Sequence, residues 1–218
     1  MAQVIAQTAV VLAAAITQGK LGDPHAIEAL AYNGLVLSIA TLLGLPVTVG
    51  LVVVFAFIRP GIRVADYLSL RPARWKPTAL GLLTVFAAGI AFDLLSKLAG
   101  RPDVPEFMVR AYQSAGFPPL LWIAVVIGAP IGEEVFFRGF LFSGLAKSRL
   151  GGWGAVVVTS LAWASVHVQY DLCDIGYIFC LGLIIGAFRL KTGSLWPPLL
   201  MHALVNLVAT IQVTLLLG

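Results

Sequence analysis

The chain has 218 residues, of which 60% are hydrophobic and only 11% charged, and its mean hydropathy is +0.97. Soluble domains are about 45–50% apolar and about 25% charged, so this composition excludes an ordinary soluble globule and indicates an integral membrane protein. The formal net charge of +4 does not indicate a nucleic-acid partner, because the basic residues lie mostly in short loops, where they set membrane orientation. The length fits a single transmembrane domain over residues 1–218, without a separate soluble module.

The apolar residues are grouped into segments that suit membrane helices, which need about 20 mostly apolar residues. Seven candidates occur, at 4–17, 29–58, 77–98, 118–146, 153–169, 175–189 and 195–217. The first is short and could be half-buried instead of crossing the membrane. The second is too long for one upright helix, so we expect "LLGLP" at 42–46 to break or kink it. The pattern predicts an all-α polytopic transmembrane bundle with about six to eight membrane segments.

Basic residues concentrate in alternate loops. These loops contain, in chain order, Arg59, Arg63, Arg71, Arg74 and Lys76; then Lys147 and Arg149; then Arg189 and Lys191. The intervening loop 170–174 carries only acidic charge, from Asp171 and Asp174. By the positive-inside rule we expect the three basic loops to be cytoplasmic. The N-terminus would then also lie inside if all seven segments cross.

The segment "APIGEEVFFRG", residues 129–139, places three ionisable groups inside an apolar stretch. Glu134 and Arg138 are four residues apart, so they share a helix face and can form an ion pair. Glu133 is rotated by about 100° from Glu134 and needs another partner or a water-filled cavity. The glycines and proline in "GAPIG", residues 128–132, should loosen the helix and free backbone carbonyls.

Two later segments also contain polar groups that lipid would not tolerate. His167 ends "WASVH", with Trp163 one helical turn before it, and His202 begins "HALVN", which places Asn206 on the same face. A single intramembrane histidine or asparagine more often joins helices than catalyses, so a structural role is favoured for Asn206 alone. A structural role is also favoured for the Glu134–Arg138 pair. Glu133 differs, because an adjacent second carboxylate adds desolvation cost without adding packing.

These three motifs resemble those of the CPBP family of intramembrane proteases, which includes the type II CAAX prenyl endopeptidases and bacterial Abi-like proteins. "EEVFFR" matches the family's EExxxR motif, "WASVH" resembles FxxxH with Trp163 in place of phenylalanine, and "HALVN" matches HxxxN. The run "TGSLWPPLLMHALVNL" also resembles the approach to the third motif. The resemblance covers roughly residues 118–210, which we take as the catalytic core.

The resemblance implies a membrane-embedded peptidase that acts on a membrane-anchored protein or peptide. In this family, Glu133 and His167 would activate a water, and His202 and Asn206 would donate hydrogen bonds to the oxyanion. Glu134 and Arg138 would support them, and no cofactor is expected. We expect the chain to be a multi-pass protein of the plasma membrane of a prokaryote.

Two rival interpretations stay open. Glutamate and histidine side chains also bind zinc, so a metalloprotease would use Glu133, His167 and His202, although no HExxH spacing occurs. A proton-coupled transporter could use the same acid and histidine residues as a relay, although the sequence shows no inverted repeat. The sequence does not select the substrate or say whether it is prenylated.

Overall fold

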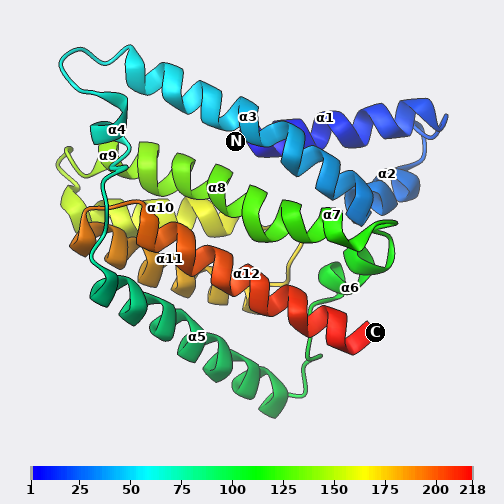
Figure 1. The fold of residues 1–218 in the computed structure, drawn as a ribbon. Helices are drawn as coiled ribbons and strands as arrows, with labels where there is room; N and C mark the ends of the chain where they lie inside the picture. The colour runs from blue at the N-terminus through cyan, green and yellow to red at the C-terminus, as the bar shows by residue number, and fades with distance from the viewer. Residues whose placement is uncertain (1, 218) are drawn as a thin grey trace. The chain divides into compact units, whose positions relative to one another are not determined.

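The computed structural model describes residues 2–217, and within that range the chain contains helices and no strand. Figure 1 shows these helices in chain order. They are α1 (Ala2–Thr17), α2 (Pro24–Ala31), α3 (Gly34–Phe57), α4 (Val64–Tyr67), α5 (Trp75–Leu98), α6 (Glu106–Gln113), α7 (Pro118–Trp122), α8 (Ala129–Glu134), α9 (Phe142–Leu145), α10 (Gly151–Ser165), α11 (Leu172–Thr192) and α12 (Trp196–Leu217). Two π-helical segments, η1 (Ile123–Gly128) and η2 (Val135–Leu141), lie between α7, α8 and α9. The all-α prediction is confirmed.

Five helical stretches are long and apolar enough to cross a membrane: α3, α5, the run Pro118–Leu145, α11 and α12. The chain is therefore an integral membrane protein. The other two of the seven predicted segments form helices that are shorter than these five stretches. The expected segment 153–169 becomes α10, whose 15 residues rise about 22 Å, less than the hydrocarbon thickness of about 30 Å. The expected segment 4–17 falls in α1, of which Thr8–Thr17 is apolar.

The predicted break in segment 29–58 lies at a different position from the one expected. The chain leaves α2 at Tyr32 and starts α3 at Gly34, whereas Pro46 lies inside α3. Asn33 explains the break, because its Oδ1 accepts a 3.0 Å hydrogen bond from the backbone N–H of Val36, as an N-cap residue does. Of the two outcomes expected at 42–46, a break is therefore wrong, and a kink stays a prediction. Apolar helices tolerate proline where nearby groups satisfy the freed carbonyl.

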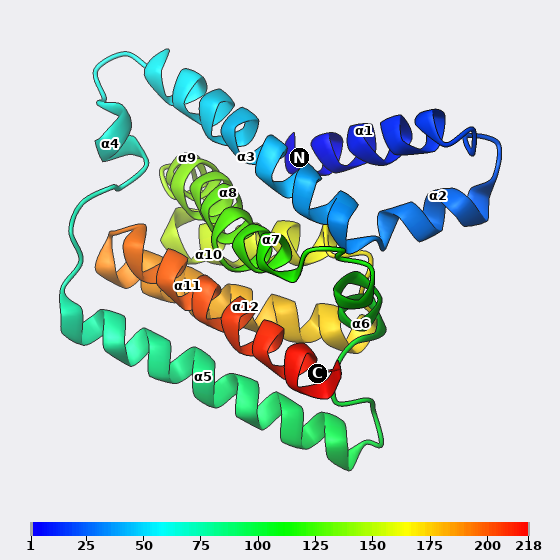
Figure 2. The ribbon, with the colours of Figure 1, turned by 45° about the vertical axis from the view of Figure 1, so that its right-hand side comes forward.

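Contacts divide the chain into two compact units. Unit 1 comprises Met1–Thr48, Val104–Gly132 and Asn206–Gly218, and unit 2 comprises Val49–Asp103 and Glu133–Val205. In unit 1, α1 and α2 are neighbours (Figure 2), and they pack through a small apolar cluster of Val11, Ala15 and Leu30. Three helical stretches run from one unit into the other, so this division leaves the single-domain prediction as it stands.

Unit 2 has the larger core, which contains side chains from α5, η2, α10, α11 and α12. Its buried members are Val85, Phe137, Trp163, Leu181, Ile185 and Met201. α11 packs closely against α10 because Gly182 and Gly186 have no side chain there. A Cβ atom at Gly182 would lie 2.9 Å from the Cβ of Ser160, and one at Gly186 would lie 3.0 Å from a Val156 methyl group. Such small residues, four apart, let membrane helices approach one another.

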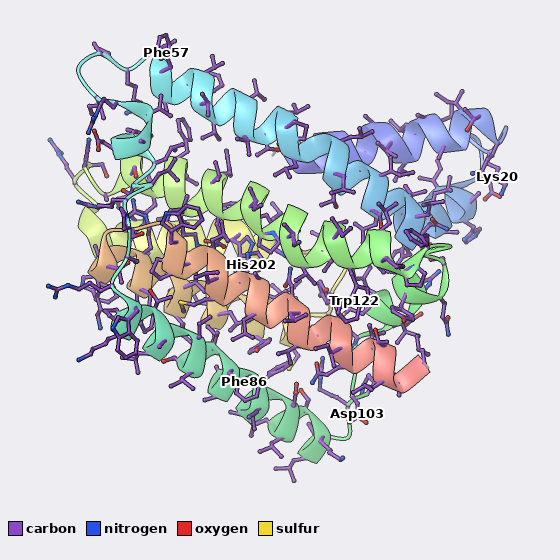
Figure 3. All side chains as sticks on the ribbon, viewed as in Figure 1. Lys20, Phe57, Phe86, Asp103, Trp122 and His202 are labelled. Atoms are coloured by element: carbon purple, nitrogen blue, oxygen red, sulfur yellow. The ribbon has the colours of Figure 1, made fainter. Side chains whose placement is uncertain are left out.

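The two ends of unit 2 carry opposite kinds of loop, and Figure 3 labels Phe57 and Asp103 toward these ends. At the first end the basic loops meet. Arg71 Nε donates to the Gly193 carbonyl at 2.6 Å, and the guanidinium of Arg59 lies over the Tyr67 ring at 4.9 Å. Lys147 lies over the same ring, at 5.8 Å. The shared sidedness expected for the three basic loops is therefore present, and its cytoplasmic assignment stays a prediction.

At the second end, Arg101 pairs with two aspartates of the acidic loop and α11. Its Nη2 lies 2.9 Å from Asp171 Oδ2 and 2.8 Å from Asp174 Oδ1. The hydrogen bond from Arg101 lowers the pKa of the Asp171 carboxyl below its ordinary value. Because α10 connects the Lys147 loop to this end, it carries the chain from one end of unit 2 to the other.

Candidate active site

The helical run Pro118–Leu145 positions both glutamates, and its backbone departs from α-helical geometry on either side of them. In η1 the N–H of Ala129 donates to the carbonyl of Ala124, five residues earlier. The next bond in that register would run from residue 130 to Val125, but Pro130 has no N–H. The Val125 carbonyl instead accepts a 2.8 Å hydrogen bond from Asn206 Nδ2. The carbonyl expected to be freed by "GAPIG" is thus satisfied by a side chain of α12, within unit 1.

Glu134 and Arg138 form the ion pair that their spacing predicts. Arg138 Nη1 lies 2.9 Å from Glu134 Oε1, and both side chains are completely buried. Arg138 Nη2 also approaches the Gly182 carbonyl at 3.5 Å, and the guanidinium lies 4.5 Å from the centre of the Trp163 ring. The Glu134 carboxylate, the Gly182 carbonyl and the Trp163 ring together compensate the positive charge of Arg138, which would be costly to bury without them.

His202 lies on α12 (Figure 3), and its two ring nitrogens approach the two glutamates. Its Nδ1 is 2.9 Å from Glu134 Oε1, and because a carboxylate only accepts, Nδ1 carries the proton. Its Nε2 points to Glu133 and lies 3.9 Å from Oε2. Glu134 therefore fixes both the tautomer and the orientation of the ring, in the way that a carboxylate orients a catalytic histidine.

Glu133 has a different environment from Glu134. Its Oε2 accepts a 2.6 Å hydrogen bond from the indole Nε1 of Trp163. Its side chain stays 16% exposed, whereas that of Glu134 is sealed. Within residues 2–217, His202 is the only basic side chain within 4 Å of this carboxylate. Glu133 is thus a carboxylate held by a neutral donor and left accessible, as a general base requires.

His167 belongs to the same cluster through Trp163 and does not contact a glutamate directly. Its Nδ1 donates to the backbone carbonyl of Trp163 at 2.7 Å, which leaves Nε2 as the acceptor of a neutral ring. The ring packs edge-on against the Trp163 indole at 5.3 Å and lies 6.2 Å from the Tyr170 ring. Burial raises the pKa of Tyr170, so its hydroxyl stays protonated.

A zinc ion would need about three protein ligands around one point at roughly 2.0–2.2 Å. Over the described range 2–217, no three His, Cys, Asp or Glu side chains are gathered closely enough to hold an ion. Glu133 and His202 approach each other to 3.9 Å, but His167 contacts neither of the two glutamates and instead bonds the Trp163 carbonyl. As placed, the residues proposed as zinc ligands do not form a metal site.

The structure brings together Glu133, Glu134, Arg138 and His202 in unit 2, with His167 joined to them by Trp163. Asn206 belongs to unit 1, where its amide bonds Val125. In the sequence, Trp163 stands out only as an aromatic in place of phenylalanine. Its partner could have been inferred from a second signal, because a buried tryptophan N–H needs an acceptor and Glu133 lacked a partner.

Comparison with known proteins gives a family for this region. Residues 115–208 match the family model described as type II CAAX prenyl endopeptidase Rce1-like. This region is similar to the Rce1-like family. The resemblance drawn from the three motifs is thereby confirmed, and the matched residues contain all of them. An uncharacterized 24.3 kDa protein of Escherichia coli is 30% identical over 131 residues. That alignment covers 58% of this chain and 58% of the relative, and no solved structure matches the chain significantly.

Proposed function

We propose that this chain is an intramembrane endopeptidase that hydrolyses a peptide bond of a membrane-anchored, CAAX-type substrate in the plasma membrane of a prokaryote. The observation that carries the proposal is the state of Glu133. It is a carboxylate in a membrane helix that is held by Trp163, faces His202 and stays partly accessible. The Rce1-like match over residues 115–208 supports peptide hydrolysis as the reaction.

In the proposed reaction, Glu133 takes a proton from water as the water oxygen bonds to the peptide carbonyl carbon. His167 shares this role, because its Nε2 is a free acceptor in the neutral tautomer that Trp163 selects. The carbonyl electron pair moves onto oxygen and gives a tetrahedral oxyanion. When that intermediate collapses, the carbonyl re-forms, the C–N bond breaks, and the proton held by Glu133 passes to the leaving amine.

His202 and Asn206 are the proposed donors to the oxyanion. His202 Nδ1 is already bonded to Glu134, so Nε2 donates only when the ring carries both protons. The Glu134 carboxylate compensates that positive charge. Asn206 uses one N–H on Val125 and retains a second amide proton. Removing one such donor typically lowers the rate by about 10²–10³-fold.

Hydrolysis in proteoliposomes tests the proposal. The substrates would be a farnesylated CAAX peptide and the same peptide without the prenyl group, with products identified by mass spectrometry. Glu133→Gln should lower turnover by about 10²–10⁴-fold while the melting temperature stays close to that of the parent. Glu106→Gln is the control, because Glu106 is an exposed acid in α6. Full activity of Glu133→Gln would overturn the assignment, and equal cleavage of both peptides would remove the prenyl requirement.

A further inference from the structure

Trp163 is the side chain that joins the polar groups of the candidate site. Its indole N–H bonds Glu133 at 2.6 Å, and the rings of His202 and His167 pack edge-on against it at 5.0 and 5.3 Å. The Arg138 guanidinium lies over its ring at 4.5 Å. The residue is only 3% exposed and belongs to the core of unit 2, so its position is fixed by packing.

The hydrogen bond to Glu133 controls which carboxylate oxygen is free. An indole has one N–H and no acceptor, so it can hold a single oxygen and cannot accept a proton in return. It holds Oε2, the oxygen that lies 3.9 Å from His202 Nε2. Within the described range, Glu133 Oε1 has no protein hydrogen-bond partner, but it is not buried away from solvent. Glu134 Oε2, in contrast, is both unpaired and buried. Oε1 is therefore the oxygen that water can reach.

We propose that Trp163 is a positioning residue that anchors Glu133 Oε2 and presents Oε1 to the attacking water. This inference rests on the proposed function. A glutamate side chain has several rotatable bonds, and a misplacement of about 1 Å can cost about 10²-fold in rate. A short bond to an ionised acceptor is roughly twice as strong as a neutral one, so a single indole can hold the carboxylate. A phenylalanine at this position, as in the FxxxH motif, would keep an aromatic ring but has no N–H, so it could not make this bond.

Kinetics of Trp163→Phe test the positioning role. The substitution keeps an aromatic ring between the histidines and removes the donor, so kcat should fall about 10- to 100-fold while KM changes less than about threefold. The matched control is Trp153→Phe, since Trp153 lies on the same helix, α10, and is 59% exposed. Unchanged kcat in a folded Trp163→Phe protein would overturn the proposal.

A spectroscopic measurement tests the bond without relying on activity. In protein labelled with ¹⁵N-tryptophan, the indole N–H signal of Trp163 is assigned by its loss in Trp163→Phe or, if that variant does not fold, by its loss in Trp163→Tyr. Glu133→Gln replaces an ionised acceptor with a neutral one and should move this signal upfield, whereas Glu106→Gln should leave it in place. A signal that ignores Glu133→Gln would show that the bond is absent.

The two measurements separate failure of this inference from failure of the proposed function. If the wild-type protein cleaves peptide but the indole signal ignores Glu133→Gln, the proposed function stands and the positioning role is wrong. If the signal responds but the wild-type protein cleaves neither peptide, the hydrogen bond stands and the catalytic role falls together with the proposed function.

Discussion

Glu134 and Arg138 form a completely buried ion pair, with 2.9 Å between Oε1 and Nη1. Glu134 Oε1 also contacts His202 Nδ1 at the same distance, so one oxygen serves an arginine and a histidine. The adjacent Glu133 is held by a neutral indole N–H. Neighbouring glutamates in one helix thus have different environments, and different consequences are expected when each loses its charge.

Glu134→Gln should mainly lower stability. The amide oxygen can still accept from His202, but Arg138 becomes a buried cation without its counter-charge, which typically costs about 3–5 kcal/mol. Thermal unfolding in detergent measures the change. Adding Arg138→Gln removes the unpaired charge and should recover part of the loss. The exposed pair Glu106–Arg110 has the same spacing, and Glu106→Gln should change stability by less than about 1 kcal/mol. A Glu134→Gln protein that is as stable as the parent but inert would show that the roles of the two glutamates are reversed.

Hydrolysis should survive thorough chelation, and purified protein should contain no stoichiometric zinc. The physical reason is that, within the described residues, no three His, Cys, Asp or Glu side chains are gathered around one point where an ion could sit. Metal analysis and activity after dialysis against a chelator provide the measurement. Activity that is lost with chelator and restored by zinc, but not by magnesium, would instead favour the metalloprotease interpretation.

Asn206→Ala should lower turnover by about 10²-fold or more with little change in KM, because a donor aimed at an oxyanion acts mainly in the transition state. The variant should also melt at a somewhat lower temperature, since the Val125 carbonyl loses its donor.

His202→Ala should lower turnover at least as severely as Asn206→Ala. The proposed function assigns both donors to one oxygen, and on that proposal the double variant should fall short of the product of the two effects. Both quantities must be measured on the same preparations, and a large loss of stability with normal specific turnover would assign Asn206 to structure alone.

The loop 59–76 should be cytoplasmic, since it carries five basic residues. Single cysteines at Ile62 and Asp103, both exposed, report the two ends of unit 2 in a background that lacks the exposed Cys173 and Cys180. A membrane-impermeant maleimide added to intact cells should label Asp103→Cys at once and Ile62→Cys only after permeabilisation. The reverse pattern would invert the topology.

Much of the candidate site could be predicted because its determinants are local. The spacing of four residues between Glu134 and Arg138 is enough to predict an ion pair, and burial of a charge in an apolar helix requires a partner. The motifs also singled out His202 as a site residue, and the structure places it beside both glutamates. The partner of Glu133 could not be read in this way, because Trp163 is 30 residues away and reaches it only through packing of α10.

The backbone was harder to predict than the side chains. Proline and glycine in "GAPIG" indicated a loosened helix, but the sequence does not say whether the helix breaks or widens, and the structure shows π-helical turns. The sequence also did not show where segment 29–58 breaks. Proline was expected to break or kink the helix at 42–46, yet the break lies at Asn33, whose side chain caps α3, and Pro46 sits within that apolar helix.

The partners of the two glutamates also imply an order of events during biosynthesis. Glu134 finds Arg138 within its own helix, so this pair can form as soon as the run Pro118–Leu145 leaves the ribosome. Glu133 must wait for Trp163 and His202, which lie in α10 and α12 and are synthesised later. An ionised side chain at the centre of an isolated membrane helix costs about 2.5–3.5 kcal/mol on insertion scales. A nascent chain that has stalled before α10 therefore holds one uncompensated acid in the bilayer, and synthesis of α10 to α12 supplies the groups that lower this cost.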